Sequence, residues 1–180
     1  MSENQLIGGW SNPAPLTEHD KKIFKEALGS LVGVSYVPHL GSMQVVNGTH
    51  YVFFCSATAM ANPQQIGFAL GEVHVNTNGG VSLTNVTTYG MVPQALGSWT
   101  EIRTLTEHET NVFKKATQGM TEFIHRPYLV SSQAAKGKNY RVFCLSTPAT
   151  LPSKIGISIL SIHEDENAEN AKITNFAAFS

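Results

Sequence analysis

Cysteine and histidine are the residues of this chain that could support covalent or metal chemistry. Cys55 could form a thiolate pair with His50 or His74, but it lies in an apolar run that should raise its pKa and bury it. No His-x-x-x-His or Cys-x-x-Cys spacing indicates a metal site. His19 and His108 are expected on the surface at helix starts. We therefore predict a protein that is not an enzyme and has no cofactor or metal.

The second cysteine, Cys144, occupies the position of Cys55 in a long internal repeat. Trp10, Phe24 and Cys55 recur 89 positions later as Trp99, Phe113 and Cys144. The match runs without a gap over about 65 positions, of which roughly a third are identical, and its period exceeds that of solenoid repeats. We therefore predict two homologous domains, residues 1–90 and 91–180. Equivalent positions in separate domains do not favour a disulfide, so both thiols are expected to be buried and free.

Each copy begins with a helix signal. Thr17 with Asp20, and Thr106 with Glu109, have the spacing of a capping box. Apolar residues then recur every three or four positions, which predicts one apolar helix face per copy. These residues are Ile23, Phe24, Ala27, Leu28 and Leu31 in the first copy, and Val112, Phe113, Ala116, Met120 and Phe123 in the second.

After the helix the apolar period changes to two, which is typical of strands. Tyr51, Phe53 and Cys55 are expected to face one side of a sheet. Turn signals such as Asn47-Gly48 and Asn62-Pro63 separate four strands in each copy. Pro38 and Pro127 interrupt the first strand of each copy, which predicts a bulge or an edge position. The fold class is therefore predicted to be α+β, with an antiparallel sheet that wraps one helix.

The composition is that of an ordinary globular protein. It is 42% hydrophobic and 14% charged, with a formal net charge of -1, which argues against binding to nucleic acid. No apolar run is long enough to cross a membrane, and the first residues do not resemble a signal peptide. We expect a cytoplasmic location, with secretion as the alternative if a signal has been removed.

The first copy resembles the cystatin superfamily, and in particular the stefins, which lack disulfides and signal peptides. Leu6-Ile7-Gly8-Gly9 is similar to the family's glycine-containing N-terminal trunk, and Gln44-Val45-Val46-Asn47-Gly48 is similar to its Gln-x-Val-x-Gly loop. The resemblance covers residues 6–89 in element order. It implies two tandem domains in which a sheet of four or five antiparallel strands wraps one helix.

The resemblance also implies a function and a binding site. Cystatins are reversible, tight-binding inhibitors of papain-like cysteine proteases, and they insert a wedge made of the trunk and two hairpin tips into the protease cleft. The protease-binding residues implied here are Gly8, Gly9, Gln44, Val45, Val46, Asn47 and Gly48. Glycine lets the trunk backbone approach a cleft closely, and Asn-Gly favours a tight turn that projects the valines.

The sequence departs from the family pattern in two places. The turn expected to form the second inhibitory hairpin tip, Asn76 to Gly80, is polar where the family has an apolar tip. The loop of the second copy has alanine in place of both valines, and the trunk of that copy offers only Leu96-Gly97-Ser98. We therefore expect a weaker or merely structural loop there, formed by Gln133, Ala134, Ala135, Lys136 and Gly137.

The leading hypothesis is a protease inhibitor whose first domain carries the activity. The alternative is a binding or structural module that keeps the fold without inhibition. Pairing of the two copies as a pseudo-dimer, or exchange of hairpins between them, also stays open. The acidic run at Glu164, Asp165 and Glu166 is interpreted as a solvated hairpin tip.

Overall fold

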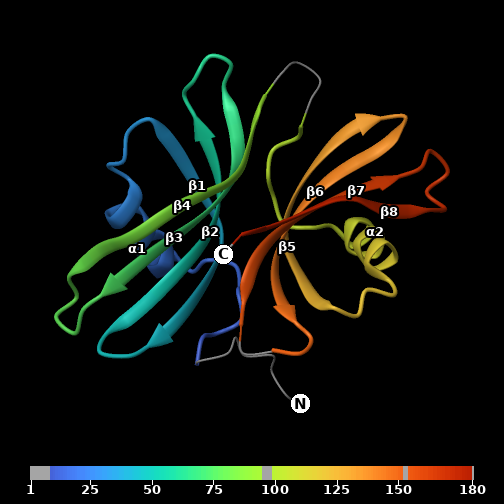
Figure 1. Ribbon diagram of the computed structural model, residues 1–180. Coiled ribbons are helices and arrows are strands. Elements are labelled where there is room, and N and C mark those ends of the chain that lie inside the picture. The colour runs from blue at the N-terminus through green and yellow to red at the C-terminus, as the bar shows by residue number, and fades with distance from the viewer. Residues whose placement is uncertain (1–8, 95–98, 152–153, 180) are drawn as a thin grey trace. The chain divides into compact units, whose positions relative to one another are not determined.

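The computed structural model describes residues 9–94, 99–151 and 154–179. The chain divides into two compact units, unit 1 (Met1–Gln94) and unit 2 (Ala95–Ser180). Each unit contains one helix followed by four strands (Figure 1). The α+β class and the predicted order of one helix and four strands are confirmed.

The helix of unit 1, α1 (Glu18–Leu28), begins at the predicted capping box. Thr17 Oγ1 accepts from the backbone N–H of Asp20 at 3.2 Å, and the Asp20 carboxylate accepts from the backbone N–H of Thr17 at 2.9 Å. These two bonds satisfy backbone donors that a helix start leaves without partners. Unit 2 repeats this arrangement at α2 (Glu107–Thr117), where Thr106 and Glu109 form the box.

Both helices end earlier than the apolar spacing predicts. The N–H of Gly29, the C-cap of α1, bonds to Lys25 O, and Leu31 lies beyond the helix with 37% of its surface exposed. In unit 2, Met120 also follows the helix, and Phe123 opens the first strand. The prediction that these three residues continue the helix faces is wrong. In unit 2, Gly119 has a φ of 86°, which ends the helical backbone, whereas in unit 1 Gly29 keeps helical dihedrals and the left-handed residue is Gly33, with a φ of 89°.

The strands of each unit form a single antiparallel sheet in sequence order. Its edge strands are the first and last, β1 and β4 in unit 1 and β5 and β8 in unit 2. The strands are β1 (Val34–Val45), β2 (Thr49–Ala59), β3 (Gln65–Val75) and β4 (Val81–Pro93), followed by β5 (Phe123–Ala135), β6 (Gly137–Pro148), β7 (Gly156–Glu164) and β8 (Ala171–Phe179). The register shifts between Pro38 and Leu40 in β1, and between Pro127 and Leu129 in β5. The predicted bulge and edge position of both proline-containing strands are confirmed.

The core of unit 1 lies between α1 and one face of its sheet. Ile23, Phe24 and Leu28 of the helix share a buried cluster with Tyr51 and Phe53 of β2. The rings of Phe24 and Phe53 meet edge to face with centroids 5.3 Å apart, a geometry that aromatic pairs favour. The predicted alternation of β2 is confirmed. In unit 2, Val112 and Phe113 of α2 share the equivalent cluster with residues of β5, β6 and β7.

Unit 2 differs from unit 1 in a polar group on the helix-facing side of its sheet. His125 Nδ1 lies 2.6 Å from Ser146 Oγ, and Ser146 is hydrogen-bonded to Ser158. Both serines are buried, and the rings of Phe123 and Phe176 flank the imidazole with centroids 5.9 and 5.5 Å away. The Nε2 atom of His125 is buried without a hydrogen-bond partner.

The corresponding positions of unit 1 are held by Tyr36, Ala57 and Ala69, which contain no imidazole or serine hydroxyl. Burial lowers the pKa of His125, because removal from water disfavours the imidazolium. The unfolded chain therefore binds a proton at a pH at which the folded chain does not. Unit 2 accordingly loses stability as the pH falls below about 6.5, the ordinary value of histidine.

The described part of the chain has no helix that is long and apolar enough to cross a membrane.

We expect the double variant His125→Tyr with Ser146→Ala, which copies unit 1, to reduce the acid sensitivity of unit 2. For the parent, proton linkage by this histidine lowers the free energy of unfolding by up to about 2 kcal/mol between pH 7.5 and pH 5. Urea unfolding of unit 2 can be followed by the fluorescence of Trp99 in a Trp10→Phe background, since each unit contains one tryptophan. His19→Tyr, at an exposed position of unit 1, is the control, and its unfolding is read from Trp10 in a Trp99→Phe background. An equal pH dependence in the parent and the double variant would contradict the prediction.

Candidate functional site

The Gln44–Gly48 loop forms the tip of the β1–β2 hairpin. The last pairs before the tip are Gln44 with His50 and Val45 with Thr49. Val45 is 71% exposed and Val46 is 49% exposed, so neither valine contributes to the core. The tip therefore presents apolar surface to solvent, which is costly unless something covers it.

The turn at the tip has the backbone that Asn-Gly was expected to supply. Asn47 has a φ of 49° and Gly48 a φ of 105°, and both values lie in the left-handed region that primed turns require. A Cβ on Gly48 would lie 2.3 Å from Val75 O and 3.1 Å from Asn76 Cα. Glycine is thus needed here for close approach as well as for φ. The β1–β2 tip rests against the base of the β3–β4 hairpin.

His74 provides a second brace for the tip. Its Nε2 lies 3.0 Å from the carbonyl oxygen of Asn47, so a side chain of β3 holds the backbone of the turn. The sequence indicated only that His74 stands near a strand end. Its partner is 27 positions away, and only the register of β2 with β3 brings the two together.

The N-terminal trunk runs beside β1. The backbone N–H of Ser11 donates to Met43 O at 2.8 Å, and Ser42 Oγ donates to Ser11 O at 2.5 Å. Gly9 has a φ of 82°, and a Cβ on it would lie 3.9 Å from Gln44 Nε2. The structure therefore brings Gly9 and Gln44 together. Gly8 lies outside the described residues.

The β3–β4 hairpin ends beside the β1–β2 tip, because Thr49 pairs with Val75. Figure 1 shows the two tips at the same end of the sheet. Asn76 Oδ1 accepts from the N–H groups of Asn78 and Gly80 at 2.9 and 2.8 Å. The side chain of Asn76 thus organises a tip that is polar, as the sequence indicates.

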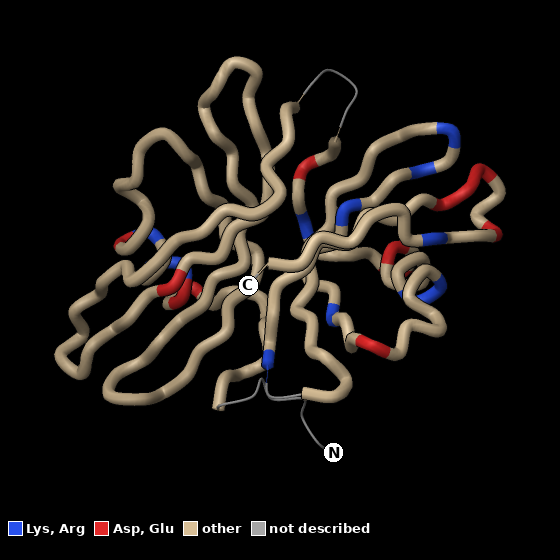
Figure 2. The backbone as a smooth tube through the Cα atoms, viewed as in Figure 1, with Lys and Arg blue, Asp and Glu red and all other residues tan. Residues whose placement is uncertain are grey.

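Charge is nearly absent from this region. From Ala27 to Thr100, Glu72 is the single Lys, Arg, Asp or Glu residue. In Figure 2 the other charges of unit 1 gather at α1, and the hairpin tips are uncharged. Any contact made by these tips therefore depends on shape, apolar area and neutral hydrogen bonds.

The equivalent loop of unit 2 differs in both backbone and surface, because Ala135 pairs directly with Gly137 and Lys136 lacks the positive φ of Asn47. Gly137 has a φ of 92°, and a Cβ on it would lie 2.1 Å from Glu164 O, so this tip also rests on the neighbouring hairpin. Ala134, Ala135 and Lys136 are exposed. The tip of unit 2 therefore lacks the larger apolar side chains that Val45 and Val46 present at the tip of unit 1.

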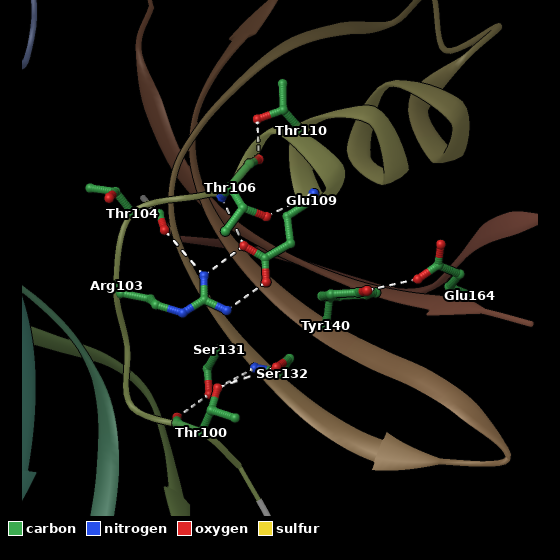
Figure 3. Close-up of polar contacts among 10 residues, drawn as sticks. All are labelled: Thr100, Arg103, Thr104, Thr106, Glu109, Thr110, Ser131, Ser132, Tyr140 and Glu164. Carbon is green, nitrogen blue, oxygen red and sulfur yellow. Dashed lines mark hydrogen bonds and ion pairs between the residues drawn. The ribbon is translucent and has the colours of Figure 1, made fainter. Parts of the chain in front are cut away.

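The trunk of unit 2 runs along β5 from Trp99 onward. Trp99 forms an isolated antiparallel β-bridge with Gln133. The guanidinium of Arg141 lies 5.5 Å from the centroid of the Trp99 indole. Thr100 exchanges hydrogen bonds with Ser131 and Ser132 (Figure 3). Residues 95–98, where the sequence places the start of this trunk, lie outside the described residues.

An ion pair ties this trunk to the start of α2. Arg103 donates to both oxygens of Glu109 at 2.6 and 2.7 Å, and Glu109 also accepts from the N–H of Thr106 at 2.9 Å (Figure 3). Burial alone would raise the pKa of Glu109, but the donors from Arg103 and Thr106 outweigh it and the pKa lies below its ordinary value. Unit 1 has Ala14 where unit 2 has Arg103. Among the described residues of unit 1, position 14 therefore provides no charged tie between trunk and helix.

Glu164 is a second buried carboxylate in unit 2. The phenol of Tyr140 donates to it at 2.7 Å, and His108 Nε2 lies 3.1 Å away. Burial, and next the hydrogen bond to Glu164, raise the pKa of Tyr140 above its ordinary value. The prediction that Glu164 belongs to a solvated tip is wrong, because its side chain turns inward to Tyr140 and only 5% of the residue is exposed.

The cysteines are buried and free, as expected. Burial raises the pKa of the Cys55 thiol to about 12 and also raises the pKa of Cys144. Neither thiol is a nucleophile at neutral pH. Among the described residues, no three His, Cys, Asp or Glu side chains are grouped for a metal.

Comparison with known proteins does not identify the chain. Models of protein families gave no match, and neither did a search of curated proteins. Among solved structures, mouse fetuin-B aligns with 93% of this chain and 69% of its own, at 13% identity and a TM-score of 0.38. A likeness at this level supports no conclusion about function.

We expect Gly48→Ala to lower the free energy of unfolding of unit 1 by about 3 kcal/mol, because the methyl group meets the Val75 carbonyl and φ is unfavourable. Gly33→Ala is the matched control, since Gly33 has a φ of 89° and nothing within 4 Å of its Cβ position. Strain alone should cost about 1 kcal/mol there. Urea unfolding followed by Trp10 fluorescence in a Trp99→Phe background measures both. Equal losses for the two variants would contradict the close contact at Gly48.

Arg103→Ala should destabilise unit 2 by about 2 kcal/mol, because it leaves the buried Glu109 without its main donor while water reaches the partly exposed site. Lys21→Ala removes the exposed ion pair with Glu18 and should cost less than about 0.5 kcal/mol. Unfolding at neutral pH with Trp99 as the probe gives the first value, and with Trp10 the second. A loss at Arg103 no larger than the loss at Lys21 would show that the ion pair contributes little.

Proposed function

We propose that both units are cystatin-like domains and that unit 1 is a reversible, tight-binding inhibitor of papain-like cysteine proteases. The observation that carries the proposal is the exposed pair Val45 and Val46, held on a tip whose backbone is fixed by Gly48 and His74. Exposed valines on a braced turn suit insertion into an apolar cleft.

Three segments of unit 1 meet at one end and would form the contact surface. They are the trunk at Gly9, the β1–β2 tip, and the β3–β4 tip at Asn76 to Gly80. Burial of each valine would contribute roughly 1.5 to 2 kcal/mol. Because the β1–β2 tip is already braced, little conformational entropy is lost on binding.

The near absence of charged residues around these tips indicates that the affinity of the proposed contact depends little on salt concentration. With Glu72 as the single charged residue from Ala27 to Thr100, electrostatic steering by this surface would be small. Inhibition should therefore change little between low and physiological ionic strength.

The alternative is a cystatin-like module that binds another protein without inhibiting a protease. The polar tip at Asn76 to Gly80 favours it, since one of the three contacts then lacks apolar area. Unit 2, with Ala134 and Ala135 at its tip, fits this alternative better than unit 1 does.

We expect Val46→Asp to weaken inhibition of papain or a cathepsin by the whole chain at least about 100-fold, because it removes an apolar contact and buries a carboxylate. Ala135→Asp, at the equivalent position of unit 2, is the matched control and should leave the inhibition constant unchanged. The measurement is a titration of active enzyme at fixed substrate.

Two outcomes would contradict the proposal. No inhibition by the parent chain at about 10 micromolar, a weak affinity, would exclude inhibition of the proteases tested. Equal inhibition by the parent and the Val46→Asp variant would place the contact elsewhere on the chain.

A further inference from the structure

His50 and His74 form a cross-strand pair next to the β1–β2 tip. They lie directly opposite each other on β2 and β3, one position from the end of the ladder at Thr49 and Val75. Their rings are stacked with centroids 4.4 Å apart and planes 23° from parallel. Both side chains are half-buried, so a small ligand can reach them.

We propose that His50 and His74 bind one divalent transition-metal ion, Cu²⁺ in preference to Zn²⁺, with water completing the coordination. Imidazole nitrogen is a favoured ligand of both ions and binds at roughly 2.0 to 2.1 Å. Opposed strand positions place the Cβ atoms about 5 Å apart. Rotation of the half-buried His50 ring about χ2 then turns one of its nitrogens toward Nδ1 of His74, while the His74 ring keeps its contact with Asn47 O.

The hydrogen bond of His74 prepares the ring for this role. Its Nε2 lies 3.0 Å from Asn47 O, so in the neutral ring Nε2 carries the proton and donates it to the carbonyl. The lone pair then resides on Nδ1 and is available to the metal. Histidine ligands in metal sites commonly donate their second ring N–H to a carbonyl or carboxylate, which fixes the tautomer.

The charge around the pair favours a cation. Sequence from Ala27 to Thr100 contains no lysine or arginine, and Glu72 lies two positions before His74 on the same side of β3. In the described part of the chain no third His, Cys or carboxylate joins the pair. The site therefore has two protein ligands, which gives moderate affinity and leaves positions open to water.

Unit 2 provides an internal contrast. The position of His50 is held there by Asn139, and His163, which replaces His74, uses Nδ1 to contact Asn139 Oδ1 at 2.8 Å. The nitrogen that would be available in His74 is engaged in His163. A metal should therefore bind unit 1 and not the equivalent place in unit 2.

The test is calorimetric titration of the untagged full chain with CuCl₂ and with ZnCl₂. We expect one ion per chain, tighter binding of Cu²⁺ than of Zn²⁺, and at least tenfold weaker binding in His50→Gln and in His74→Gln. His163→Gln should bind like the parent. Metal should also raise the urea midpoint of unit 1, read from Trp10 in a Trp99→Phe background, because the ion links β2 to β3.

Parent-like binding in either single variant, or equal weakening in His163→Gln, would overturn the site and indicate adventitious binding to scattered histidines. Circular dichroism of each variant establishes that it is folded before titration. No protease is present in this experiment, so its outcome is independent of the proposed inhibition.

Discussion

The packing of a short helix against one face of a sheet is the constraint on which each unit depends. An isolated helix of 11 residues is marginal in water, so α1 persists because Ile23, Phe24 and Leu28 bury themselves against β2 and β3. That contact also fixes the strand register. A slip of one residue in β2 would turn Phe53 away from Phe24 and would displace the tip from its brace on Val75.

Local features of the fold could be predicted from the sequence, and features that depend on distant partners could not. Neighbouring residues in the sequence determine the capping boxes at Thr17 and Thr106, the alternation through Phe53 and the irregularity at Pro38. The helix ends were misjudged because apolar spacing continues past Gly29. Spacing describes a potential helix face, but it does not show at which residue the helical hydrogen bonds stop.

In the candidate site, too, the features set by neighbouring residues were predictable and those set by distant partners were not. The turn at Asn47 and Gly48 follows from residue type, but its braces do not, since His74 and Val75 reach it from another hairpin. Glu164 was misjudged for a related reason. Its acidic neighbours suggest solvent, and only the register of β6 with β7 reveals that Tyr140 lies within reach.

Contact between Gly48 and the base of the β3–β4 hairpin has a consequence for how binding specificity can change. The two tips contact each other through the backbone atoms of Val75 and Asn76, so they form one surface. The exposed side chains beyond Asn76, at Thr77 and Asn78, can be exchanged without removing the contact between Asn76 and Gly48. A change at Val75 or Asn76 would instead shift both tips at once. New specificity is therefore easiest to select, or to engineer, in the outer part of the second hairpin, while the first keeps its shape.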